Sequence, residues 1–162
     1  MKIRKNIYWR VPLFCIAAGV ITFNAVVYLI GRFMIVTLPG GAVTTDSTRM
    51  LIAYGAIFIL TLIVGGVFFF RNMTRKEIFY SASIIVALSL IVVLIQWAFN
   101  VTTGPIAVFY MYASQAFEWS SIIPLLLFRV NGNLWLGALI GSLAPYLFIL
   151  FGKKSINSDC SN

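Results

Sequence analysis

Long apolar runs separated by short polar segments dominate the pattern of this chain. Five runs are long enough to cross a bilayer as helices, which takes about 20 apolar residues. They cover residues 11–31, 50–70, 78–99, 106–128 and 134–151. This pattern predicts an all-α fold, a polytopic transmembrane helix bundle with five spans, forming a single domain over residues 1–152. The polar residues 153–162 are expected to form a disordered tail.

Local signals indicate where several of these helices begin or bend. Thr74 and Glu77 fit a capping box at the start of the third span. Asp46 or Ser47 is placed to cap the second span. In the fifth run, Pro145 lacks the backbone N–H that a continuous helix requires. We therefore expect the fifth helix to kink near this proline.

Composition places the protein in the membrane rather than in water. Of its 162 residues, 61% are hydrophobic and only 10% are charged, whereas soluble domains are about 25% charged. The net charge is +8, but the basic residues lie between apolar runs, as in proteins anchored at a membrane surface. There is no basic face interleaved with aromatic residues of the kind that binds nucleic acid. The expected partner is the lipid bilayer.

The sequence offers little for catalysis or metal binding. It contains no His, the commonest general base and metal ligand. Its two cysteines, Cys15 and Cys160, have no metal-binding spacing. Three of the four acidic residues, Asp46, Glu77 and Asp159, fall in loops or in the tail. We expect no metal, no cofactor and no enzymatic activity.

The positions of Lys and Arg favour a cytoplasmic N-terminus. With five spans, eight basic residues lie inside and four outside. The four outside include Lys153 and Lys154, and two lysines on the outer side are unfavourable for the five-span arrangement. In the alternative, 106–128 dips in and returns as a re-entrant segment, leaving four spans and a count of nine against three. We prefer five spans because 23 uninterrupted residues suit a span. The basic start and the uncleaved first span are compatible with the cytoplasmic membrane of a bacterium.

Glu118 is the one acidic residue inside an apolar run. It is the thirteenth of the 23 residues 106–128, which places it near the bilayer midplane. A charged carboxylate there costs roughly 3 kcal/mol. Arg129 lies eleven positions along the same helix, about 16 Å away, too far to form a pair. Glu118 must therefore be neutral, bonded to another helix, or in contact with water.

The polar residues of this run gather on one side of a continuous helix. At about 100° per residue they fall within an arc of roughly 140°. With Asn24 of the first span, they are the candidates for a substrate or proton pathway. The candidate residues are Glu118, Gln115, Ser114, Tyr110, Ser121 and Asn24. The alternative is that Glu118 is neutral and only holds neighbouring helices together.

Two functions are compatible with these features. The first is a small transporter of the permease type, expected to be oligomeric, in which Glu118 loads and releases a proton. The second is a non-catalytic accessory or assembly subunit that binds another membrane protein. Gly137 and Gly141 form a GxxxG motif, which packs helices together within or between chains. The second function would use this motif and the polar side of 106–128.

Overall fold

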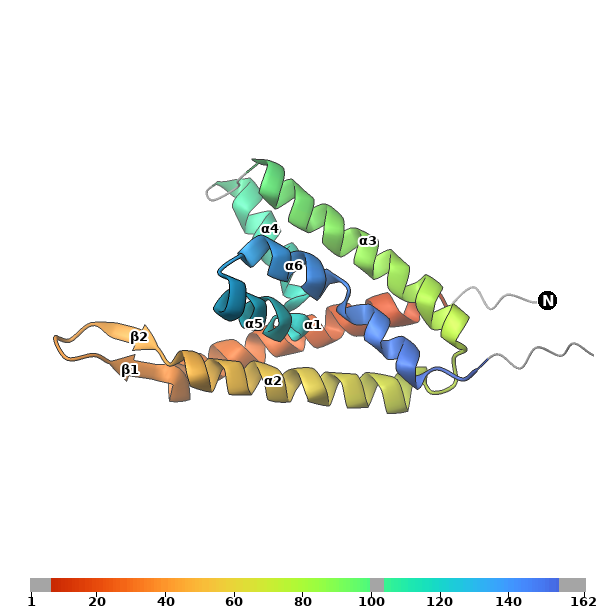
Figure 1. Ribbon diagram of the computed structural model, residues 1–162, viewed down its shortest axis with the longest axis horizontal. Helices are drawn as coiled ribbons and strands as arrows, with labels where there is room; N and C mark the ends of the chain where they lie inside the picture. The colour runs from red at the N-terminus through yellow and green to blue at the C-terminus, as the bar shows by residue number, and fades with distance from the viewer. Residues whose placement is uncertain (1–6, 100–103, 155–162) are drawn as a thin grey trace, which may run out of the picture.

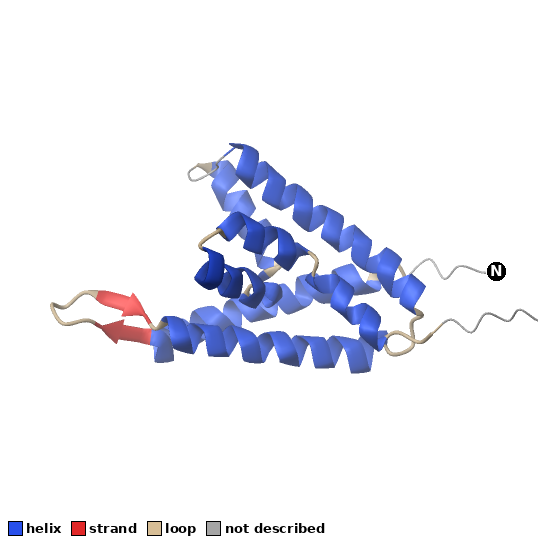
Figure 2. Ribbon diagram, in the orientation of Figure 1, coloured by secondary structure: helices blue, strands red, loops and turns tan. Residues whose placement is uncertain are grey.

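The computed structural model describes residues 7–99 and 104–154, which form a bundle of helices with one β-hairpin at its end (Figures 1 and 2). The helices are α1 (Arg10–Leu29), α2 (Ser47–Ile63), α3 (Arg75–Phe99), α4 (Pro105–Gln115), α5 (Ile122–Asn131) and α6 (Leu134–Ser142). The hairpin pairs β1 (Ile35–Thr37) with β2 (Val43–Thr45) in antiparallel register. The predicted helical bundle is confirmed, and the hairpin is an addition to it.

Four helical segments are long and apolar enough to cross a membrane. They cover Arg10–Met34, Ser47–Phe70, Arg75–Phe99 and Leu134–Phe151. The first two end in π-helical turns, Ile30–Met34 and Val64–Phe70. These four segments agree within three residues at each end with the first, second, third and fifth predicted runs. Helices of this kind are compatible with a polytopic membrane protein.

The helix caps predicted from the sequence at the starts of α2 and α3 are present. The Thr74 N–H donates to Glu77 Oε2 at 2.8 Å, and the Glu77 N–H donates to Thr74 Oγ1 at 3.3 Å, which completes the capping box. Asp46, rather than Ser47, caps α2 by accepting from the N–H groups of Thr48 and Arg49. The last span also changes its helical geometry near Pro145, as expected from the sequence. There α6 ends at Ser142, and a 3₁₀ helix, η4 (Ala144–Phe151), follows.

The predicted fourth span, 106–128, is not a continuous helix. The chain leaves α4 after Gln115, forms a short 3₁₀ helix, η3 (Glu118–Ser120), and starts α5 at Ile122. Pro124 accounts for the start of a new helix at Ile122. Inside a continuous helix its missing N–H and its ring would disrupt the preceding turn, whereas in the first turn of α5 neither is costly. The prediction of one straight helix here was wrong, and five spans are not confirmed.

Helices α4 and α5, the two halves of this segment, contact α1 at different positions along its length. The end of α4 contacts the middle of α1, because the carbonyl groups of Gln115 and Ala116 lie directly against Gly19. From there α5 turns back toward the hairpin, packing Ile122 against Val26 of α1 and Tyr54 of α2. Thus α5 leads away from the centre of the bundle.

A tight turn at Gly132, which has φ of +66°, joins α5 to α6. The two GxxxG glycines of α6 both face Pro124. A Cβ at Gly137 would lie 2.8 Å from Pro124 Cα, and one at Gly141 would lie 3.1 Å from Pro124 Cδ. The motif therefore packs α6 closely against α5 within the chain.

The end of η4 returns to the end of the bundle where α1 begins. The Lys153 N–H donates to the Met73 carbonyl at 2.9 Å, and its own carbonyl accepts from Arg75 at 3.1 Å. Figure 1 shows the start of α1 and the end of η4 at the right, opposite the hairpin. Lys153, the first residue of the predicted tail, is therefore bonded to the bundle, and residues 155–162 lie outside the described part of the chain.

One buried pair of hydroxyl groups joins α3 to α6. Ser89 Oγ donates to Ser142 Oγ at 2.8 Å, and Ser142 Oγ donates to the Ala138 carbonyl at 2.9 Å. Hydrogen bonds between membrane helices contribute about 0.6 kcal/mol on average. In a double-mutant cycle of Ser89→Ala and Ser142→Ala, we expect a coupling of about that size in the unfolding free energy measured in mixed micelles. A coupling of zero would mean that the hydroxyls act independently.

Candidate functional site

The carboxyl group of Glu118 is bonded to another helix. The Tyr54 hydroxyl of α2 donates a hydrogen bond to Glu118 Oε1. Tyr54 is only 5% exposed, and Glu118 is half-buried. The one salt bridge among the described residues joins Arg49 to Asp46 near the hairpin and does not involve Glu118. The only acid in the predicted spans is thus held by a neutral donor.

Helix α1 packs closely against the segment where the helix is interrupted, immediately before Glu118. A Cβ at Gly19 would lie 2.3 Å from the Gln115 carbonyl oxygen and 2.4 Å from that of Ala116. Such distances are impossible for a side chain, so only glycine lets α1 contact this backbone. Contact with α1 therefore fixes the position of the segment between α4 and η3, immediately before Glu118.

Trp119 anchors the segment on its other side. Its side chain is 1% exposed. The indole stacks on Phe58 of α2, with ring centroids 5.7 Å apart and planes 10° apart, and contacts Phe148 of η4 at 5.6 Å. Phe58 lies at the middle of the span Ser47–Phe70. The residue after Glu118 is therefore fixed in the centre of the bundle.

The indole N–H of Trp119 is the one buried side-chain polar atom without a hydrogen-bond partner in the described part of the chain. A buried tryptophan N–H usually finds an acceptor, and leaving one unpaired costs about 1–3 kcal/mol. This donor belongs to the residue next to Glu118. The centre of the bundle thus contains a bonded carboxyl group and an unpaired N–H on adjacent residues.

The break changes how the other predicted polar residues are arranged. Tyr110 and Ser114 share one face of α4, and Gln115 is its last residue; all three are half-buried. The Ser114 hydroxyl donates to the Met111 carbonyl of its own helix at 2.9 Å. Ser121 follows the break, and its N–H donates to the Glu118 carbonyl at 3.1 Å. The single polar arc predicted from a continuous helix therefore does not extend past Gln115.

Asn24 is placed differently from the expectation. Its side chain is exposed on α1, and its amide donates to the Val20 carbonyl at 2.8 Å. An amide satisfied by its own helix needs no partner from another. The structure records no bond between Asn24 and the residues around Glu118 in the described part of the chain.

Tyr54 was not among the candidate residues predicted from the sequence. A signal was present, since Tyr54 and Thr61 carry the only side-chain polar atoms in the run 50–70. A tyrosine hydroxyl within an apolar run needs a partner, and Glu118 is the strongest acceptor in the spans.

No group of three or more His, Cys, Asp or Glu side chains that could hold a metal ion occurs within residues 7–99 and 104–154. No family model, no curated protein and no solved structure matches this chain.

Proposed function

We propose that the protein is a small membrane transporter of the permease type in which Glu118 carries a proton during the transport cycle. The observation that supports this most directly is the position of Glu118. It lies at a helix break, between residues packed on α1 and α2, and accepts a hydrogen bond from Tyr54. Ionisable residues inside a membrane are costly and mark ion pathways and proton relays.

The broken segment resembles the discontinuous helices around which transporters build their binding sites. With 11 and 10 residues, α4 and α5 are about 16 and 15 Å long. Each is half the thickness of a hydrocarbon core of about 30 Å. We propose that the pair enters the bilayer from the hairpin side and returns, so that Glu118 lies close to the point of return.

The Tyr54–Glu118 bond gives the carboxyl group two defined states. As a carboxylate, Glu118 accepts from the Tyr54 hydroxyl. As a neutral acid it carries an O–H of its own and can donate instead. In a low-dielectric interior the negative charge of the carboxylate must be neutralised, either by a proton that binds to it or by a positively charged group beside it. This requirement would couple movement of a substrate to movement of a proton.

The proposed orientation places both termini in the cytoplasm. Four spans put the two ends on one side, and the basic residues then divide nine inside against three outside. The proposed location is the cytoplasmic membrane of a bacterium. We expect alkaline phosphatase fused after Lys154 to be inactive and green fluorescent protein fused there to be bright. The opposite result would place the C-terminus outside and restore a fifth crossing.

Transport can be tested with purified protein in liposomes. The liposomes would contain a pH-sensitive dye and carry an imposed proton gradient. Alkali metal ions, primary and quaternary amines, and amino acids would then be added one class at a time. We expect one class to dissipate the gradient faster than in protein-free liposomes. If no class does so, the transporter proposal is wrong.

The second candidate function, an accessory subunit, is favoured by the hairpin. Both faces of its two strands are exposed, including Val43 at 67% and Ile35 at 50%. A two-stranded hairpin is marginally stable without packing partners. A membrane protein that copurifies at fixed stoichiometry in mild detergent would support this function. Recovery of a homo-oligomer alone would count against it.

A further inference from the structure

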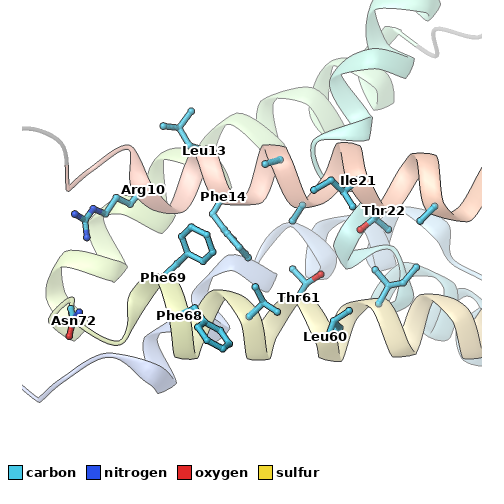
Figure 3. Close-up of a pocket in the computed structure, with 15 residues that line it drawn as sticks. Arg10, Leu13, Phe14, Ile21, Thr22, Leu60, Thr61, Phe68, Phe69 and Asn72 are labelled. Atoms are coloured by element: carbon cyan, nitrogen blue, oxygen red, sulfur yellow. The ribbon is translucent and has the colours of Figure 1, made fainter.

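A groove with a volume of about 850 Å³ runs between α1 and α2, and neither Tyr54 nor Glu118 lines it. Figure 3 shows its two walls, with side chains from both helices directed into it. Most of the lining is apolar, and several lining side chains are widely exposed, including Ile21 at 69% and Leu60 at 62%. Small residues, Ala17 and Ala18, leave the space open on the α1 side.

The groove has a cationic end. Arg10, the first residue of α1, lines it together with Asn72 from the turn before α3, and Figure 3 shows both at the same end. Arg10 forms no salt bridge within the described residues. Glu77, in the first turn of α3, does not line the groove and accepts the Thr74 N–H in the capping box. A guanidinium and an amide are thus available to an anion at this end.

The length of the groove suits a chain that enters from one leaflet. From Arg10 to Thr22 is about 18 Å along α1, slightly more than half of a hydrocarbon core of about 30 Å. Thr22 and Thr61 then face the groove from the two helices (Figure 3). The lining between Arg10 and these hydroxyls includes Leu13, Phe14 and Phe68. A hydrocarbon chain fits the apolar part, and its charged end would meet Arg10.

We infer that this groove binds one anionic phospholipid, with an acyl chain between α1 and α2 and the phosphate on Arg10. An open apolar groove within a membrane must be filled, because a void loses dispersion contacts and water there is costly. Any lipid chain meets that need. Arg10 makes the site selective, since a guanidinium binds phosphate oxygens through paired charge-assisted hydrogen bonds. The inference requires only that α1 and α2 cross the membrane and does not depend on transport.

The test is native mass spectrometry of delipidated protein, titrated with phosphatidylglycerol or with phosphatidylcholine of the same chain length. We expect the first phosphatidylglycerol to bind at least tenfold more tightly than phosphatidylcholine. Arg10→Gln should abolish this preference. Arg71→Gln is the matched control, because it removes the same charge at the same end without lining the groove. Equal binding of the two lipids by the wild type, or equal losses in the two variants, would overturn the inference.

A second pair of variants tests the groove itself. Ala17→Phe fills it and should weaken the first phosphatidylglycerol at least tenfold. Ile16→Phe enlarges an exposed neighbour that does not line the groove and should leave binding unchanged. If Ala17→Phe binds normally, the lipid lies elsewhere. If delipidated protein forms dimers that exclude phosphatidylglycerol, a second copy occupies the groove. Either result contradicts the inference, and the Arg10→Gln comparison stands even if Ala17→Phe does not fold.

Discussion

Glu118→Gln is expected to reduce substrate-dependent proton flux in liposomes to that of protein-free liposomes. Glutamine has the shape of glutamate and retains a carbonyl oxygen that accepts from the Tyr54 hydroxyl. It cannot exchange a proton, so each transport cycle would stop at the loading step. Because the hydrogen bond and the packing remain, the unfolding free energy should change by no more than about 1.5 kcal/mol, the upper end of the net contribution of a typical hydrogen bond. The initial rate of gradient dissipation and thermal unfolding in detergent measure the two effects.

Glu77→Gln is the matched control for this substitution. Glu77 undergoes the same chemical change outside the bundle centre, and glutamine can replace glutamate in a capping box. Its flux should equal that of the wild type. Full flux in Glu118→Gln would contradict the proposed mechanism and would leave Glu118 a structural bond between α2 and η3.

Gly19→Ala is expected to destabilise the protein by about 1–3 kcal/mol, the usual cost of overpacking. The added methyl group would lie 2.3 Å from the carbonyl oxygen of Gln115 and 2.4 Å from that of Ala116. These are backbone atoms, which cannot rotate away as the end of a side chain would. Alanine is also a better helix former than glycine by about 1 kcal/mol, but the collision with the α4 backbone outweighs this gain. Denaturation of the purified protein in mixed micelles measures the difference.

Gly55→Ala provides the comparison on α2. A Cβ at Gly55 would meet its nearest neighbour, Ile122 Cδ1, at 4.0 Å, which is ordinary van der Waals distance. The helix-propensity gain should then dominate, so this variant should be as stable as the wild type or slightly more so. If the two variants are equally stable, α1 does not hold the break between α4 and η3.

Four of the helices could be predicted from hydropathy because the bilayer sets their length directly. The same reasoning failed at 106–128, since the hydropathy of an apolar run is the same whether the run forms one helix or two. Pro124 was the available indication of a break. It becomes decisive only when its place in the first turn of α5 is known.

The hairpin and the partner of Glu118 were missed for different reasons. The two strands of the hairpin, Ile35–Thr37 and Val43–Thr45, consist entirely of β-branched residues and flank a Pro-Gly-Gly turn. This composition favours strands, but three residues are too few to distinguish a strand from a loop. Tyr54 was missed because the rotation of each helix about its axis depends on side-chain packing. Gly19 sets how closely α1 approaches the break, and no periodicity in one helix specifies such a contact.

The enclosed indole of Trp119 gives the centre of the bundle an optical signal of its own. It stacks on Phe58, contacts Phe148 and is 1% exposed. It should therefore fluoresce at shorter wavelength than the exposed Trp9 and Trp97. The carboxyl group on the preceding residue can quench that emission or shift its colour when its charge changes. The difference between the spectra of the wild type and Trp119→Phe would therefore report a change of charge at Glu118.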